Sequence, residues 1–127
     1  MKKTGLYTAL LALFAVSCVT GGMSVYTFPN GDKYTGQMLR GKRNGKGTVV
    51  HATGAVYEGR WFNDKRHGYG VMTFPDGSKY EGKWKADLRS GSGKMKYANG
   101  DFYDGLWSND KRNGRGEYRS SDGAVYN

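Results

Sequence analysis

The chain is organised by a 23-residue internal repeat. Tyrosines recur in strict register at Tyr34, Tyr57, Tyr80, Tyr103 and Tyr126. Three of these tyrosines begin a segment of the form Tyr-(Glu/Asp)-Gly-x-Trp, and a Gly-x-Gly segment follows at 45–47, 68–70, 91–93 and 114–116. A fixed period of this length is typical of repeat proteins, in which each unit packs only on its neighbours. We therefore expect an array of similar small units rather than a domain with one central core.

Within each repeat, apolar or glycine positions alternate with polar ones. In Tyr57-Glu58-Gly59-Arg60-Trp61 the odd positions are aromatic or glycine and the even positions are charged. Residues 68–74 alternate in the same way. A period of two residues indicates a β-strand with one buried face. Each repeat is therefore predicted to form two strands, and no helical period is found after residue 20.

A turn segment such as Ala52-Thr53-Gly54 joins two strands in every repeat. A two-residue turn would place aromatic and polar side chains on the same face, whereas a three-residue loop brings the two apolar sets together. The register predicted for that loop is Tyr57 opposite Val49, Gly59 opposite Gly47 and Trp61 opposite Gly45. This predicts a type I turn followed by glycine in the left-handed region. The remaining connections are predicted as polar loops of about six residues, at 40–45, 63–68, 86–91 and 109–114.

Glycine recurs at strand positions where it would ordinarily weaken a sheet. Its regular placement indicates that another group needs the space a Cβ would occupy. We expect a neighbouring indole to lie flat on the backbone at Gly45, Gly68, Gly91 and Gly114 and at the glycines two positions further on.

The chain is basic, with 20 Lys and Arg against 11 Asp and Glu and a net charge of +9. Such a surplus favours attraction to polyanions but carries no information about the fold. Only 37% of the residues are hydrophobic, so the core is expected to be thin.

The first residues have the features of a secretory signal. Lys2 and Lys3 precede an apolar run of 11 residues, 6–16, which is too short to cross a bilayer. Ala15-Val16-Ser17-Cys18 resembles the lipobox of bacterial lipoproteins, which implies cleavage before Cys18 and acylation of that cysteine. The alternative is an ordinary signal peptide that leaves a free thiol. We predict a signal peptide at 1–17, a lipidated Cys18 with a short tether at 18–24, and an exported, lipid-anchored protein of the cell envelope.

The complete unit resembles the MORN repeat (membrane occupation and recognition nexus). It consists of Tyr-Glu-Gly-x-Trp, a Lys-Arg segment, Gly-x-Gly and then Asp-Gly, and the resemblance covers roughly residues 25–127. Departures occur at Thr35 and Met38, at Leu88 and Ser90, and in the unfinished fifth copy. The resemblance implies an all-β fold, a single-layer twisted antiparallel meander with about four full hairpin repeats and partial ends. It also implies membrane association, protein contacts or self-association without catalysis.

The residues offer no catalytic, cofactor or metal site. His51 and His67 lie far apart in sequence and have no cysteine partner. Glu58, Glu81 and Asp104 recur with the repeat, so they share one environment, whereas an acid–base pair needs two. The Gly-x-Gly segments precede no helix and do not predict a phosphate-binding loop. We therefore predict that the protein is not an enzyme.

Two sets of side chains are candidates for ligand binding. The first is one arginine per repeat, Arg43, Arg66, Arg89 and Arg112, which could take carboxylates or phosphates bidentately. The second is Trp61, Trp84 and Trp107. The alternatives are that the arginines pair with the nearby Asp64, Asp87 and Asp110, and that the tryptophans form the core face.

The first hypothesis for function is a membrane-anchored scaffold that binds a protein partner, or a second copy, through the sheet. The alternative is direct binding of anionic lipid or another polyanion through the arginine-bearing loops. Nucleic acid is disfavoured as a partner because an exported chain seldom meets it.

Overall fold

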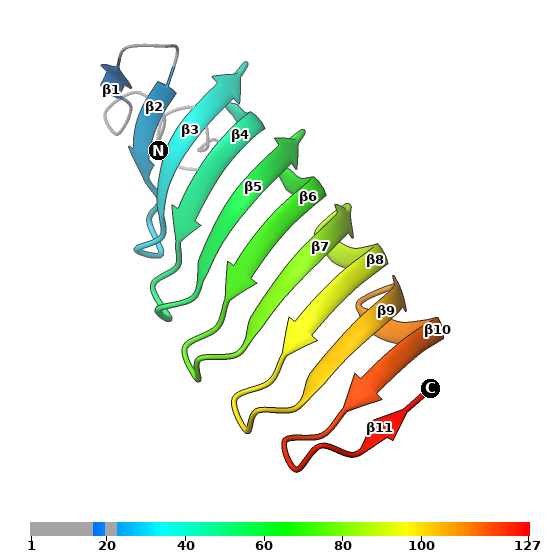
Figure 1. Ribbon diagram of the computed structural model, residues 1–127. Helices are drawn as coiled ribbons and strands as arrows, with labels where there is room; N and C mark the ends of the chain where they lie inside the picture. The colour runs from blue at the N-terminus through cyan, green and yellow to red at the C-terminus, as the bar shows by residue number, and fades with distance from the viewer. Residues whose placement is uncertain (1–16, 20–22) are drawn as a thin grey trace.

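The computed structural model describes residues 17–19 and 23–127, which form one sheet of 11 strands (Figure 1). The strands are β1 (Ser17–Val19), β2 (Met23–Thr27), β3 (Lys33–Leu39), β4 (Lys42–Val50), β5 (Val56–Phe62), β6 (Lys65–Thr73), β7 (Lys79–Lys85), β8 (Leu88–Lys96), β9 (Phe102–Ser108), β10 (Lys111–Arg119) and β11 (Val125–Tyr126). Each strand pairs antiparallel with the next in sequence. The all-β, single-layer meander is confirmed, and residues 17–19 and 23–127 contain no helix.

The predicted signal segment lies outside the described residues except for Ser17. Cys18 is in β1, where its backbone is opposite Ser24 of β2. In the segment expected to be a tether, β1 ends at Val19 and β2 begins at Met23. Cleavage and lipidation at Cys18 remain predictions.

The register predicted for the three-residue turns is confirmed. Tyr57 lies opposite Val49, Gly59 opposite Gly47 and Trp61 opposite Gly45. In the turn, the Gly54 N–H donates to the His51 carbonyl at 2.9 Å, and Gly54 has a φ of +100°. The left-handed residue after the turn is therefore the glycine, as the sequence predicted.

The other connections are shorter than predicted. Asn63 and Asp64 form a two-residue turn between β5 and β6, with φ angles of 51° and 71°. Positive φ at both central positions identifies a type I′ turn, which matches the twist of the flanking strands. The expected six-residue loop is wrong because β6 begins at Lys65 and continues through a bulge, where the register shifts between Trp61 and Gly59. The arginine of each repeat and the residue before it, which is lysine in three repeats and Leu88 in the other, therefore lie on a strand.

Tyrosine, and not tryptophan, occupies the space above the second glycine of each Gly-x-Gly segment, whereas at the first, such as Gly68, the nearest side chain is that of Arg60. The ring of Tyr57 lies over Gly70, so that a methyl group on Gly70 would overlap the phenol. The Tyr57 hydroxyl donates to the Arg60 carbonyl at 2.8 Å, and the Trp84 Nε1–H donates to the Gly70 carbonyl at 3.3 Å. The indole therefore bonds to the glycine backbone from the next repeat and does not lie flat on it.

Tyrosine and tryptophan rings alternate along one face of the sheet and form the core. The Trp84 ring meets Tyr57 of the preceding repeat and Tyr80 of its own, at centroid distances of 5.5 and 5.2 Å and interplanar angles of 90° and 85°. Edge-to-face contacts of this kind favour the aromatic quadrupoles. Tyr57 and Tyr80 are fully buried. We call this the aromatic face, and the side with Glu58 and Arg60 the polar face.

Candidate functional site

Each predicted arginine except the last holds the next repeat in place. Arg66 Nε lies 3.0 Å from Asp87 Oδ1, and its Nη2 donates to the Asp87 carbonyl at 3.2 Å. The backbone N–H groups of Arg66 and Asp87 add bonds of 2.9 and 3.0 Å to the partner residue. The guanidinium also stacks 4.7 Å from the centre of the Trp84 ring. We call this set of contacts the arginine clamp.

The clamp occurs three times with the same spacing in sequence. The ion pairs are Arg43–Asp64 at 2.6 Å, Arg66–Asp87 at 3.0 Å and Arg89–Asp110 at 2.6 Å. The predicted pairing with these aspartates is confirmed, and the three arginine side chains are only 16–23% exposed. These guanidinium groups are therefore engaged within the sheet, while their binding to a ligand remains a prediction.

Arg112 differs from the other three arginines. It is exposed and forms no ion pair with any residue of 23–127. Its guanidinium lies 5.6 Å from the ring centre of Tyr103 and 5.2 Å from that of Tyr118. Within residues 23–127, Arg112 therefore contacts aromatic rings and no clamp aspartate.

The predicted tryptophans belong to the core. Trp61, Trp84 and Trp107 are only 4–5% exposed, and an arginine guanidinium covers each ring. The reading of this stripe as the core face is confirmed. Binding of a ligand to these rings remains a prediction.

Burial in the core shifts the pKa values of tyrosines, and the arginine clamp shifts that of Asp110. Burial raises the pKa of Tyr34 and of Tyr80 to about 12. Burial opposes ionisation of Asp110, but the hydrogen bonds and charge of Arg89 outweigh it and lower the pKa of that carboxyl. Asp110 is therefore held in its charged form at neutral pH.

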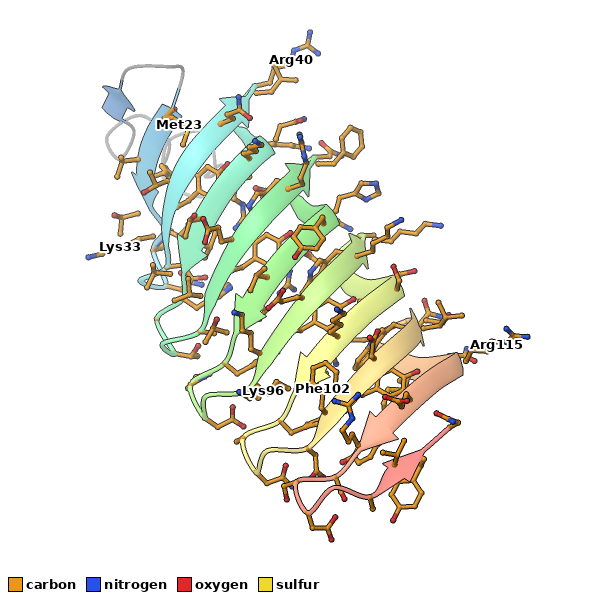
Figure 2. The ribbon with its side chains drawn as sticks, in the orientation of Figure 1. Met23, Lys33, Arg40, Lys96, Phe102 and Arg115 are labelled. Carbon is orange, nitrogen blue, oxygen red and sulfur yellow. The ribbon has the colours of Figure 1, made fainter. Side chains whose placement is uncertain are left out.

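A basic and apolar edge lies at the end of the sheet that carries the type I′ turns. Cross-strand pairs place Phe62 opposite Lys65 and Leu88 opposite Lys85. The exposed members of this lysine edge are Leu39, Lys42, Phe62, Lys65, Lys85, Leu88 and Lys111. Figure 2 shows Arg40 projecting beyond the same end, and Lys33 beyond the opposite one. Sequence reasoning assigned Lys42, Lys65 and Lys111 to the loops that carry the predicted arginines, and it missed the exposed Leu39, Phe62 and Leu88 beside them.

A notch of about 440 Å³ opens on the aromatic face beside a three-residue turn. Its apolar walls are Phe74, Pro75 and Met95, and its polar lining residues are Asp76, Ser78 and Arg89. Phe74 packs against the core but remains partly exposed. The notch could hold an apolar side chain of another molecule beside charged groups of both signs.

The recurring carboxylates form one row on the polar face. Val71 lies opposite both Glu58 and Glu81 on its two neighbouring strands. Lys94 lies in the same way opposite both Glu81 and Asp104. The row agrees with the predicted charged stripe.

Of the two histidines, His51 has a carboxylate neighbour: its Nδ1 lies 3.0 Å from an oxygen of Asp32. Residues 17–19 and 23–127 hold no group of three or more His, Cys, Asp or Glu side chains arranged to bind a metal. In the same part of the chain, no helix meets the length and hydropathy of a membrane span.

Known proteins match the chain in sequence pattern and, weakly, in structure. The profile of the family described as MORN repeat matches residues 25–33, 34–56, 57–79, 80–102 and 103–125. No curated protein sequence matches significantly. Among solved structures, the SAS-4 (dCPAP) TCP domain of Drosophila melanogaster, in complex with a proline-rich motif of Ana2 (dSTIL), is 12% identical with a TM-score of 0.32. The match covers 87% of this chain and 74% of that one, and a likeness of this degree supports no conclusion about function.

Proposed function

Because this chain belongs to the MORN repeat family, whose repeats generally serve protein or membrane interaction and not catalysis, we propose that it is a scaffold that binds a protein partner through its aromatic face. The notch bounded by Phe74 and Met95 is the observation that carries this proposal. A concave apolar site next to a charge suits an anchoring side chain of a partner protein. Arg89, which lines the notch, is held by its ion pair with Asp110.

Site-specific photocrosslinking in the cells that make the protein tests this function. A crosslinking amino acid replaces Phe74 at the notch or, as the control, Phe102 at the start of β9. We expect a discrete adduct with one protein from position 74 and none from position 102. Pro75→Asp, at an exposed wall of the notch, should abolish the adduct while the purified variant keeps its β-sheet circular dichroism. Equal adducts from both positions, or none from position 74, would remove the support for the notch.

We further propose that Cys18 anchors this scaffold to a membrane of the bacterial envelope. The lipobox-like residues that precede Cys18 support the proposal, because two or more acyl chains hold a protein on a membrane where one chain binds only marginally. Mass spectrometry of the mature N-terminus should find an acylated Cys18. The Cys18→Ser variant should leave the membrane fraction, and an unmodified mature cysteine would contradict the anchor.

The lysine edge favours anionic lipid as a second candidate ligand. It combines four exposed lysines with Leu39, Phe62 and Leu88, whereas three of the four predicted arginines are already paired. Each lysine near an anionic surface contributes about 1 kcal/mol. Changing Lys42, Lys65, Lys85 and Lys111 to Gln should therefore weaken sedimentation with vesicles of phosphatidylcholine and phosphatidylglycerol at least tenfold. If Arg112→Gln alone weakens binding as much, the lysine edge is not the site.

A further inference from the structure

Two neighbouring hollows lie on the polar face, opposite the buried rings. Their volumes are about 430 and 260 Å³, and Tyr69 lines both. Met23, labelled in Figure 2, borders the larger hollow. The backbone at Gly59 lines one hollow and the backbone at Gly82 the other, so no side chain fills either site at these positions. Tyr69 therefore lies between two shallow hollows.

Tyr69 has no evident role in the fold. Its side chain is 57% exposed, and its hydroxyl has no hydrogen-bond partner in the part of the chain that the structure describes. The same repeat position holds Lys46, Ser92 and Arg115, so the repeat does not require an aromatic ring there. An exposed ring between two hollows offers a flat apolar platform with a negative π-face.

The charged groups around the ring have both signs. The charged lining residues are Lys46, Glu58 and Arg60 in the larger hollow and Glu81, Lys83, Lys94 and Asp104 in the smaller one. Within residues 23–127, Glu58, Arg60 and Lys83 form no ion pair, whereas Glu81 contacts Lys79 at 3.3 Å. The heads of these side chains are therefore available to donate and accept hydrogen bonds. A polyanion would meet repulsion from the carboxylates, whereas a neutral molecule with many hydroxyl groups can use both kinds of partner.

We propose that this face binds a neutral, linear β-1,4-linked glycan across the strands, with one sugar ring stacked on Tyr69 and its neighbours in the two hollows. The C–H groups on the face of a pyranose ring carry partial positive charge and suit the π-face of tyrosine. The hydroxyl groups at the ring edge donate to Glu58 and Glu81 and accept from Arg60 and Lys83. An extended chain is needed because the hollows lie on both sides of the tyrosine.

Isothermal titration calorimetry of the full chain with cellohexaose and with chitohexaose tests the proposal. We expect saturable binding of at least one probe, weakened about tenfold or more by Tyr69→Ala, as for removal of an anchoring aromatic side chain. Glu58→Gln should weaken it less, because the amide still accepts a hydrogen bond. Phe62→Ala is the matched control, since Phe62 is similarly exposed but lines neither hollow. Binding should change less than about twofold between 50 and 500 mM NaCl, because no net charge is neutralised.

Three results would overturn the glycan site. They are no binding of either hexasaccharide, unchanged binding by folded Tyr69→Ala, and equal loss in Phe62→Ala. The hollows share no lining residue with the notch, so the two sites are independent. The crosslink from position 74 should therefore persist in Tyr69→Ala. Loss of the glycan alone and loss of the protein adduct alone are therefore separate outcomes.

Discussion

The guanidinium of Arg66 stacks on Trp84 and bonds to Asp87, so one arginine contacts two residues of the following repeat. The first full copy has Met38 and Gly41 where later copies have the tryptophan and the aspartate. It therefore lacks both groups that a preceding arginine would contact. The clamp gives the array a direction, because each repeat provides an arginine toward its successor.

Arg66→Gln should lower the free energy of unfolding by ~1.5–3 kcal/mol, because it removes a stacked cation and leaves charge-assisted hydrogen bonds unmade. Arg112→Gln is the matched control and should cost less than half as much, since Arg112 has no aspartate partner among residues 23–127. Urea denaturation followed by tryptophan fluorescence measures both. Equal losses would show that stacking alone, without the ion pair, accounts for the effect.

Gly70→Ala should be more harmful than Gly68→Ala, although only Gly68 has a positive φ, of 76°. A Cβ on Gly70 would overlap the buried Tyr57 ring, while one on Gly68 would lie 3.6 Å from Arg60, an ordinary contact. We expect a loss above ~3 kcal/mol for Gly70→Ala, as for an overpacked core, and ~1–2 kcal/mol for the strained Gly68→Ala. Denaturant midpoints of the two variants decide the order, and the reverse order would contradict the packing of tyrosine on glycine.

Ala86→Asn should stabilise the protein. Ala86 has a φ of 49° in its type I′ turn, where the equivalent residues are Asn63 and Asn109. Asparagine adopts the left-handed region more readily than alanine. The expected gain is ~0.5–1 kcal/mol, seen as a higher melting temperature. The reverse change, Asn63→Ala, should cost a similar amount, and no change in either variant would argue against this turn type.

Stability should fall as the pH rises from 10 toward 12. A tyrosine in the unfolded chain ionises near pH 10, whereas burial raises the pKa of Tyr34 and Tyr80 to about 12 and that of Tyr57 still further. Over this interval the unfolded chain releases protons that the folded chain retains, so the equilibrium shifts toward unfolding. Urea titrations at pH 9, 10, 11 and 12 should show the decline, with a smaller one in Tyr57→Phe. Constant stability over that range would contradict it.

The register at Tyr57 could be predicted because a period of two fixes which turn length brings the two apolar sets together. The place of Arg66 could not, since a run such as Asn-Asp-Lys-Arg has the composition of a solvated loop. Its burial depends on Trp84 and Asp87, which belong to the next repeat. The available signal was the constant spacing of 21 residues between clamp arginine and aspartate. The hollows beside Tyr69 gave no periodic signal, because Tyr69 is a departure from the repeat.

Every strand of this sheet bonds only to the strands next to it in sequence. Removing residues 57–79 would join Val56 to Tyr80, and Arg43 would then meet Trp84 and Asp87 in place of Trp61 and Asp64. Deletion or duplication of a whole repeat would therefore leave every junction with the same kinds of contact as before. The length of the protein is thus free to change through recombination, while the geometry of each junction stays the same.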